Sequence, residues 1–273
     1  WQGGPSPDGV RLGSRFLYKT LRDSIDFHVV DSNESPADTK HDIKHYAPIL
    51  SNMQQCVSWL KQRKPRTLFT LGGDCSIDVA PIDWLHSQYG KEFGLIWIDA
   101  HADIHVPEAS ETKFFHGMPL RTLLGEGDAG ILSALSAPLS RRQICYAGIR
   151  SIDPPEIQYI AKHHLPVLTA DEINAGNYGT FLRWRERSGI RHLHIHFDLD
   201  ALDPGSDIAV TYHVPGGIRY DAMQAFLRFL HGQGMTVGFT LTEYAATQET
   251  PQEIARVLKL ASCVVPLPEV LAA

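Results

Sequence analysis

Short apolar runs alternate along this chain with longer stretches in which apolar residues recur every three or four positions. The two clearest runs are FGLIWI at 93–98 and LHIHF at 193–197. Short runs rich in β-branched and aromatic residues indicate buried strands, whereas recurrence every three or four positions is typical of amphipathic helices. Strands that alternate with helices predict right-handed crossovers and a mainly parallel sheet covered on both faces.

The same patterns give approximate positions for each element. Strands are predicted at 27–30, 67–71, 93–98, 143–149, 166–169, 193–197 and 236–241. Helices are predicted at about 41–63, 76–88, 117–124, 155–163, 220–231 and 250–261. Since no Pro/Ser-rich linker and no repeat divides the sequence, we expect a single domain over residues 1–273. The long loops at 104–116, 124–140 and 201–218 are expected to belong to that domain.

Polar residues follow nearly every predicted strand at its carboxyl end. These are Asp74-Cys75, Asp99 to His105, Arg150 to Asp153, Asp198 to Asp203, and Glu243. In an open parallel sheet, ligands bind at this edge, where the carboxyl ends of the strands meet. A single Asp-x-His or Asp-x-Asp is most often a solvated turn, but two such motifs behind two buried strands favour a shared site.

The two acidic motifs, DAHADIH at 99–105 and DLDALDP at 198–204, contain no Lys or Arg that could balance their charge. Adjacent carboxylates repel one another and are costly to bury without a positive partner. A divalent cation is the natural partner, and aspartate oxygens with imidazoles suit Mn²⁺ or, less selectively, Fe, Co and Zn. The aspartates at 99, 103, 198 and 200 could balance two such ions, which at ~3.5–4 Å apart can activate water.

Several other polar residues have a structural interpretation that we favour. Asp74 and Asp203 are expected to organise the turns that follow their strands. His192, His194 and His196 alternate with apolar residues along one predicted strand. We interpret them as core histidines, or as residues that support a site from behind.

Composition excludes several classes of function. The formal net charge of −6 and the isoelectric point near 6.1 provide no basic surface for nucleic acid or an anionic membrane. No apolar run approaches the ~20 residues of a membrane span. The four cysteines are scattered with no CxxC pair, which argues against a disulfide framework and favours a reducing, cytoplasmic compartment. Residue 1 is Trp and not an initiator Met, so the absence of a signal-like apolar stretch at the start is weak evidence for the compartment.

Taken together, the motifs resemble those of the ureohydrolases, the superfamily of arginase and agmatinase. The family pattern runs G-G-D-H-S, D-A-H-x-D, H-G, D-x-D-x-x-D-P, and then a late glutamate after a strand. This chain has GGDCS at 72–76, DAHAD at 99–103, His116-Gly117, DLDALDP at 198–204, and Glu243. Order and spacing match from about residue 67 to 262, so the resemblance covers most of the chain.

The resemblance implies a three-layer α/β/α sandwich around a mainly parallel sheet of about eight strands. It also implies a dinuclear Mn²⁺ centre and a homo-oligomer, commonly a trimer or a hexamer. In such a centre the ligands would be Asp99 and Asp198 as bridges between the ions, Cys75 and Asp103 on one ion, and His101 and Asp200 on the other.

The implied activity is hydrolysis of a guanidino or amidino C–N bond by a metal-activated hydroxide, which releases urea from a small cationic substrate. Glu243 would hold the cationic group, because a carboxylate matches guanidinium in charge and geometry. His116 would pass a proton to the leaving amine, because imidazole titrates near neutral pH. Asp103 is counted with these catalytic residues.

The loop expected to face the substrate matches the arginases only in part. Asp153 and Glu156 stand at positions that lie near the α-amino group in those enzymes, and His105 at one that helps to hold the carboxylate. Phe114 stands at another carboxylate position and cannot donate a hydrogen bond. L-Arginine is therefore one candidate substrate beside other guanidino compounds, and an agmatinase-like or formiminoglutamase-like hydrolase is an alternative.

Cys75 is the main departure, since the family has histidine as its first metal ligand there. A cysteine ligates as a thiolate, which is soft and favours Zn²⁺ or iron over Mn²⁺. Three interpretations stay open: Cys75 ligates with a changed metal preference, it stays a neutral thiol beside a weakened or empty site, or a neighbour such as His105 replaces it. The centre would then hold two ions or one, and a degenerate, non-catalytic interaction protein is the competing hypothesis.

Overall fold

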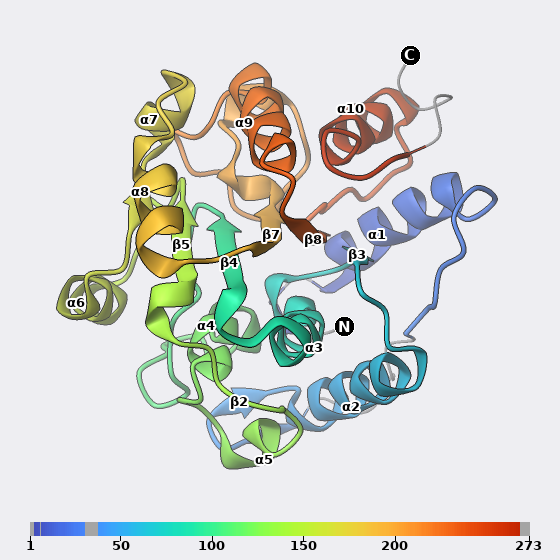
Figure 1. Ribbon diagram of the computed structural model, residues 1–273. Coiled ribbons are helices and arrows are strands. Elements are labelled where there is room, and N and C mark those ends of the chain that lie inside the picture. Colours follow the sequence, from blue (N-terminus) through green and yellow to red (C-terminus); the bar gives the residue numbers. More distant parts are fainter. Residues whose placement is uncertain (1–2, 6, 31–37, 268–273) are drawn as a thin grey trace.

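Six parallel strands form the central sheet of the computed structural model, which describes residues 3–5, 7–30 and 38–267 (Figure 1). They are β3 (Leu68–Leu71), β4 (Phe93–Ile98), β5 (Ile144–Ala147), β6 (Val167–Leu168), β7 (His192–Asp198) and β8 (Thr236–Thr242). Their order across the sheet is β3-β8-β7-β4-β5-β6. The long strands β7, β4 and β8 thus occupy the interior of the sheet.

Helices connect these strands and precede the first of them. They are α1 (Pro7–Leu21), α2 (Tyr46–Arg63), α3 (Val79–Tyr89), α4 (Pro119–Leu123), α5 (Ala129–Leu132), α6 (Pro154–His163), α7 (Ala170–Asn174), α8 (Gly179–Ser188), α9 (Tyr220–Gly232) and α10 (Pro251–Ala261). A small antiparallel pair, β1 (Thr39–Lys40) and β2 (Ile43–Lys44), lies just before α2. Within the described residues, no helix is both long and apolar enough to span a bilayer.

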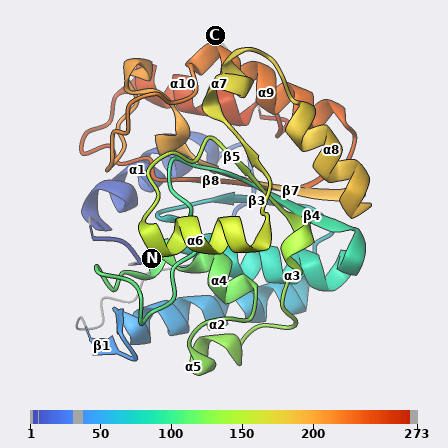
Figure 2. The same cartoon turned by 90° about the vertical axis from the view of Figure 1, so that its left-hand side faces the viewer.

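The helices cover both faces of the sheet and give the structure three layers. One apolar core packs α1, α8, α9 and α10 against one face, and a second packs α2, α3, α4 and α6 against the other. Figure 2 shows α9 and α10 above the sheet and α2, α3 and α4 below it. Along β4, Ile96 and Ile98 enter the first core while Leu95 and Trp97 enter the second, as the alternation of strand side chains requires. The predicted α/β/α sandwich is confirmed.

The predicted strand at 27–30 is wrong, and the described part of the sheet has six strands where about eight were expected. Residues 27–30 instead line, together with β3, a cavity of about 470 Å³. The Phe27 ring packs against Phe69 with 6.3 Å between the ring centroids. Residues 27–30 are half-buried or exposed, with Val29 50% exposed, so the apolar run lacks the burial that its composition predicts for a strand.

All but one of the predicted helices begin and end within three residues of their expected bounds. The helix expected from about residue 41 begins at Tyr46, after the turn made by β1 and β2. α1 and α8 were not predicted. α1 does show helical recurrence, since Val10, Leu17 and Leu21 are buried on one face, whereas α8 carries the polar sequence RWRERS.

Strand register brings the residues that follow four strands to one edge. Ile98 of β4 pairs with Phe197 of β7, so the residues that follow them also lie side by side. Asp198 pairs with Thr242 of β8. The backbone N–H of Glu243, just after β8, donates to the carbonyl of Gly73 at 2.8 Å and joins the turn after β3 to the same edge.

Gly13 allows α1 to approach the chain just beyond β8. A Cβ atom at this position would lie 1.8 Å from the carbonyl oxygen of Tyr244, which is backbone and cannot rotate away. We expect Gly13→Ala to lower the free energy of unfolding by ~2–3 kcal/mol in denaturant titrations, as overpacking does. Gly232→Ala in α9 is the matched control, because nothing lies within 4 Å of its added Cβ. Equal effects of the two substitutions would contradict this account of the helix contact.

Candidate metal centre

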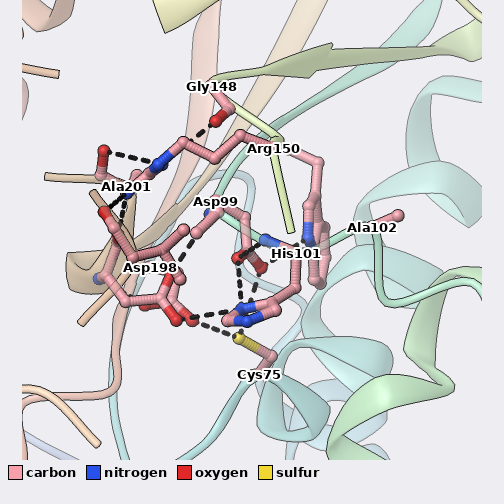
Figure 3. A network of polar contacts seen from close by, with 12 residues as sticks. Cys75, Asp99, His101, Ala102, Gly148, Arg150, Asp198 and Ala201 are labelled. Atoms are coloured by element: carbon pink, nitrogen blue, oxygen red, sulfur yellow. Dashed lines mark hydrogen bonds and ion pairs between the residues drawn. The ribbon is translucent and has the colours of Figure 1, made fainter. Parts of the chain in front are cut away.

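Five side chains with metal-binding atoms meet at the carboxyl edge of the sheet (Figure 3). Asp99 directly follows β4, and His101 comes two residues later. Asp198 ends β7, and Asp200 lies in the 3-10 helix that follows it. Cys75 begins the 3-10 helix η1 (Cys75–Asp78) after β3. The close-up shows the Cys75 sulfur directed at the carboxylate of Asp198, with His101 beside them.

Backbone N–H groups fix the aspartates of this edge. Asp99 accepts from the N–H of His101 at 2.6 Å, and Asp198 accepts from the N–H of Asp200 at 2.7 Å. Asp200 in turn accepts from the N–H of Ala100 at 3.1 Å, which joins the two acidic motifs. The carboxylates are therefore oriented by the fold before any ligand binds.

The first group of donors comprises Asp99, His101 and Asp200. His101 Nδ1 lies 3.0 Å from an oxygen of Asp200 and 3.5 Å from an oxygen of Asp99. Burial acts to lower the pKa of His101, but hydrogen bonds to the two carboxylates raise it to about 12. A protonated His101 thus supplies the positive charge that these carboxylates need, and a divalent cation held by the same three residues fits that requirement.

The second group comprises Cys75, Asp198 and Glu243, with one donor atom of each within 4.8 Å of the others. The Cys75 thiol donates to an oxygen of Asp198 at 3.0 Å. Burial first, and then the charge of nearby carboxylates, raises the pKa of Asp198, of Glu243 and of the Cys75 thiol well above their usual values. Ionising all three groups together requires a cation, so this donor set also fits a metal ion.

Two residues of the predicted centre have unusual backbone conformations. Asp103 has a φ of 48° and Glu243 a φ of 61°, in the left-handed region that non-glycine residues rarely adopt. Burial and the charge of Asp99 raise the pKa of the Asp103 carboxyl well above its usual value. Asp103 belongs to none of the three-donor groups among the described residues, so its role as a ligand stays a prediction. Strained residues that a fold retains are typical of functional sites.

His116 provides a neutral imidazole near this edge. Burial lowers its pKa below the usual 6.5, although the charge of Asp74 opposes that shift. Its ring stacks with Tyr212 at 6.4 Å between centroids and meets Phe114 edge-on at 6.3 Å. Tyr212 also contacts the ring of His101, at 5.7 Å between centroids. An uncharged imidazole with these neighbours is able to accept a proton at neutral pH.

Three of the four residues predicted to bind substrate lie together, and Glu243 lies apart from them in the second donor group. His105 Nε2 is 2.9 Å from an oxygen of Asp153 and 3.7 Å from one of Glu156. Glu156 is buried, and its oxygens accept from the backbone N–H groups of Ile104 and Asp153, both at 3.1 Å. Glu156 therefore anchors the loop to the start of α6, whereas Asp153 remains exposed. This arrangement places His105 with these carboxylates and leaves its role as a replacement for Cys75 untested.

Asp74 and Asp203 organise turns, as predicted. Asp74 accepts from the N–H of Ser76 at 3.0 Å. Asp203 accepts from the N–H of Gly205 at 3.1 Å with one oxygen and from that of Gly217 at 3.2 Å with the other. The second bond connects the two ends of the loop that follows β7.

Arg150 follows a strand, as predicted, but no role for it was predicted from the sequence. Its guanidinium donates to the backbone carbonyls of several residues in the loops after β5 and β7 (Figure 3), namely Gly148, Asp200, Ala201, Leu202, Val214 and Pro215. Burial lowers the pKa of Arg150 below its usual value, and the charges of Asp200 and Asp99 oppose that shift. The acidic motif after β7 is therefore held by a single side chain with several donors.

His196 was interpreted from the sequence as a core histidine or as one that supports a site from behind, and it is fully buried. One of its ring nitrogens lies within 4.8 Å of donor atoms of Cys75 and of Asp99, which makes a third group of possible ligands. The available signal was Asp78, three residues after Cys75 on the same short helix. A buried carboxylate at that position can hold an imidazole that faces the site.

A model of the arginase family matches residues 5–264 of this chain. The curated arginase of Staphylococcus aureus (strain COL) is 33% identical over 180 residues, which is 63% of this chain and 58% of that protein. The arginase of Agrobacterium fabrum is 28% identical over 256 residues, which is 87% of this chain and 77% of the relative. The chain thus spans less than two thirds of the length of the Staphylococcus relative.

Among solved structures, an arginase has a fold similar to that of this chain. The crystal structure of Entamoeba histolytica arginase in complex with L-ornithine superposes with a TM-score of 0.83 at 24% identity. The match covers 94% of this chain and 92% of that one. At this level of identity the match supports the fold alone.

We expect Arg150→Lys to lower the free energy of unfolding by ~2–4 kcal/mol, because an ammonium group cannot reach all of these carbonyls, and each buried carbonyl left without a donor is costly. Thermal or denaturant unfolding measures the change. Arg187→Lys on the exposed face of α8 is the matched control, for which we expect a change within ~0.5 kcal/mol. An equally small loss for Arg150→Lys would show that the loop is held by other contacts.

Proposed function

The chain belongs to the arginase family, and we propose that it is a metal-dependent hydrolase that cleaves a guanidino or amidino C–N bond and releases urea. The observation that carries this proposal is the convergence of two groups of metal-binding side chains at one edge of the sheet, with Glu243 among them. A buried carboxylate beside two acidic groups is a suitable partner for a small cationic substrate.

Two divalent cations are the proposed cofactors, most simply Mn²⁺. Asp99, His101 and Asp200 would hold one, and Cys75 and Asp198 the other, with Asp103 as the further predicted ligand. When bound, such cations would supply a Lewis acid that polarises the substrate and makes water nucleophilic at neutral pH. Oxygen donors suit Mn²⁺, whereas the sulfur of Cys75 favours Zn²⁺, Fe or Co in its half of the centre.

Glu243 and His116 would act on the substrate itself. The Glu243 carboxylate is buried with its pKa raised, so an incoming guanidinium would remove the cost of its ionisation. Two parallel hydrogen bonds to that carboxylate would orient the carbon that is attacked. His116 would take up a proton and pass it to the leaving amine, since its lowered pKa keeps it uncharged at neutral pH.

The far end of the substrate would meet His105 and Asp153. The Asp153 carboxylate is exposed and pairs with His105, so it can also attract an amino group, while Glu156 is occupied with backbone N–H groups. Phe114 offers a ring where a polar group would bind a carboxylate. L-Arginine, a guanidino compound without that carboxylate, and an amidine of the agmatinase or formiminoglutamase type are therefore the substrates to compare. A homo-oligomer and a cytoplasmic location are proposed with this function.

The protein is to be loaded separately with Mn²⁺, Fe²⁺, Co²⁺ and Zn²⁺ and assayed for urea with L-arginine, agmatine and other guanidino acids, and for formamide with formiminoglutamate. We expect product from at least one of these compounds, and none after treatment with a chelator until metal is restored, because the metal supplies the Lewis acid. Products are measured by chromatography with mass detection. No product from any compound with any metal would favour a non-catalytic interaction protein.

Asp99→Asn should reduce this activity by ~10²-fold or more, because it removes a charged ligand from the buried centre. Asp171→Asn is the matched control, since Asp171 is exposed in the first turn of α7. The control should retain the activity of the unsubstituted protein. Full activity of Asp99→Asn under saturating metal would contradict the assignment of the centre.

A further inference from the structure

His196 is a fully buried imidazole with one nitrogen engaged and the other unpartnered. Its Nδ1 lies 2.9 Å from an oxygen of Asp78. Its Nε2 has no hydrogen-bond partner among the described residues, although the side chain is 0% exposed. A buried nitrogen left in this state costs free energy, and a ligand that uses its lone pair would remove that cost.

Asp78 fixes which nitrogen of His196 carries the proton. The Asp78 carboxylate also lies 2.8 Å from His194 Nε2 and accepts a hydrogen bond from the hydroxyl of Thr240 at 2.7 Å. Three hydrogen-bond donors thus face the one carboxylate of Asp78, which accepts from all of them. A carboxylate can only accept, and a neutral His196 therefore carries hydrogen on Nδ1 and a free lone pair on Nε2.

That lone pair is available to the proposed centre. One nitrogen of His196, the sulfur of Cys75 and an oxygen of Asp99 lie within 4.8 Å of one another, and since Nδ1 is held by Asp78, the available nitrogen is Nε2. Trp97 fixes the plane of the imidazole, with 3.4 Å between ring centroids and 4° between planes. The same indole donates to Asp99 at 2.9 Å, so ring and carboxylate are positioned together.

We propose that His196 Nε2 is a metal ligand and that it completes, with Cys75 and Asp99, a sulfur–nitrogen–oxygen site in one half of the centre. This inference rests on the metal centre of the proposed function. The imidazole at the end of β7 supplies the nitrogen donor that position 75 lacks. Asp78, His196 and the ion form the carboxylate–histidine–metal arrangement that orients many metal-binding imidazoles. Thiolate, imidazole and carboxylate together suit Zn²⁺ or Co²⁺ better than Mn²⁺.

Two matched substitutions distinguish a metal-binding His196 from a histidine that only packs in the core. His196→Asn keeps an amide donor near the place of Nδ1, opposite Asp78, and removes Nε2. His194→Gln keeps an amide donor near the place of His194 Nε2, which also faces Asp78, and changes a ring that belongs to none of the donor groups. Both variants retain a hydrogen bond to Asp78, so loss of that bond cannot explain a difference between them.

The experiment titrates Co²⁺ into the chelator-treated full chain and measures bound metal by mass spectrometry and the sulfur-to-cobalt charge-transfer band by absorption. The unsubstituted protein and His194→Gln should bind two ions per chain with this band. His196→Asn should bind one ion, or the second at least ~10-fold more weakly, with a shifted or missing band. Cys75→Ser should lose the band. Unchanged stoichiometry, affinity and spectrum in His196→Asn would overturn the proposal.

A measurement on the unsubstituted protein covers the case in which His196→Asn does not fold. X-ray absorption of the Zn²⁺-loaded chain should show sulfur at ~2.3 Å and imidazole nitrogen at ~2.0–2.1 Å, with two imidazoles per pair of ions. A single imidazole per pair would overturn the proposal. Because none of these readouts uses a substrate, a chain that binds metal through His196 but hydrolyses nothing would refute the proposed function alone.

Discussion

Like charges buried close together are the constraint on which this structure depends. Asp99, Asp198 and Asp200 sit at strand ends where the sheet and its helices exclude water, and their mutual repulsion opposes the packing that brings them there. Residue types with this cost persist only where something of opposite charge is recruited. In the protein alone, His101 supplies the positive charge. A divalent cation is better suited to this role, because it can contact several carboxylates at once.

The other contacts at this edge of the sheet hold the buried carboxylates in place. Hydrogen bonds within each acidic motif orient the carboxylates, and Arg150 holds the loop behind one of them through backbone carbonyls without neutralising their charge by direct pairing. The two apolar cores make the edge rigid from both faces, since β4 and β7 are buried along their length. Strain at Asp103 and Glu243 is tolerated because this frame determines their positions.

Much of this site could be predicted because its signals are local. A buried strand followed by Asp-x-His or Asp-x-Asp determines both the position and the direction of the aspartates, so Asp99 and Asp198 were placed correctly at one edge. The strand predicted at 27–30 failed because a short apolar run fixes neither burial nor a partner strand, and these residues are half-buried or exposed. His196 was interpreted as a core histidine or as one that supports a site from behind, because period-two alternation shows which face a side chain joins and not which ring nitrogen is left without a partner. That distinction depends on Asp78, which comes from another strand–helix junction.

The network around Asp78 also limits which substitutions this region can accept. Asp78 accepts hydrogen bonds from His194, His196 and Thr240, which lie on two neighbouring strands far away in the chain. Removing its carboxylate would leave several buried donors without a partner at once, whereas removing one donor leaves the other bonds in place. The cost of a substitution here therefore depends on whether it removes the shared acceptor or one of its donors.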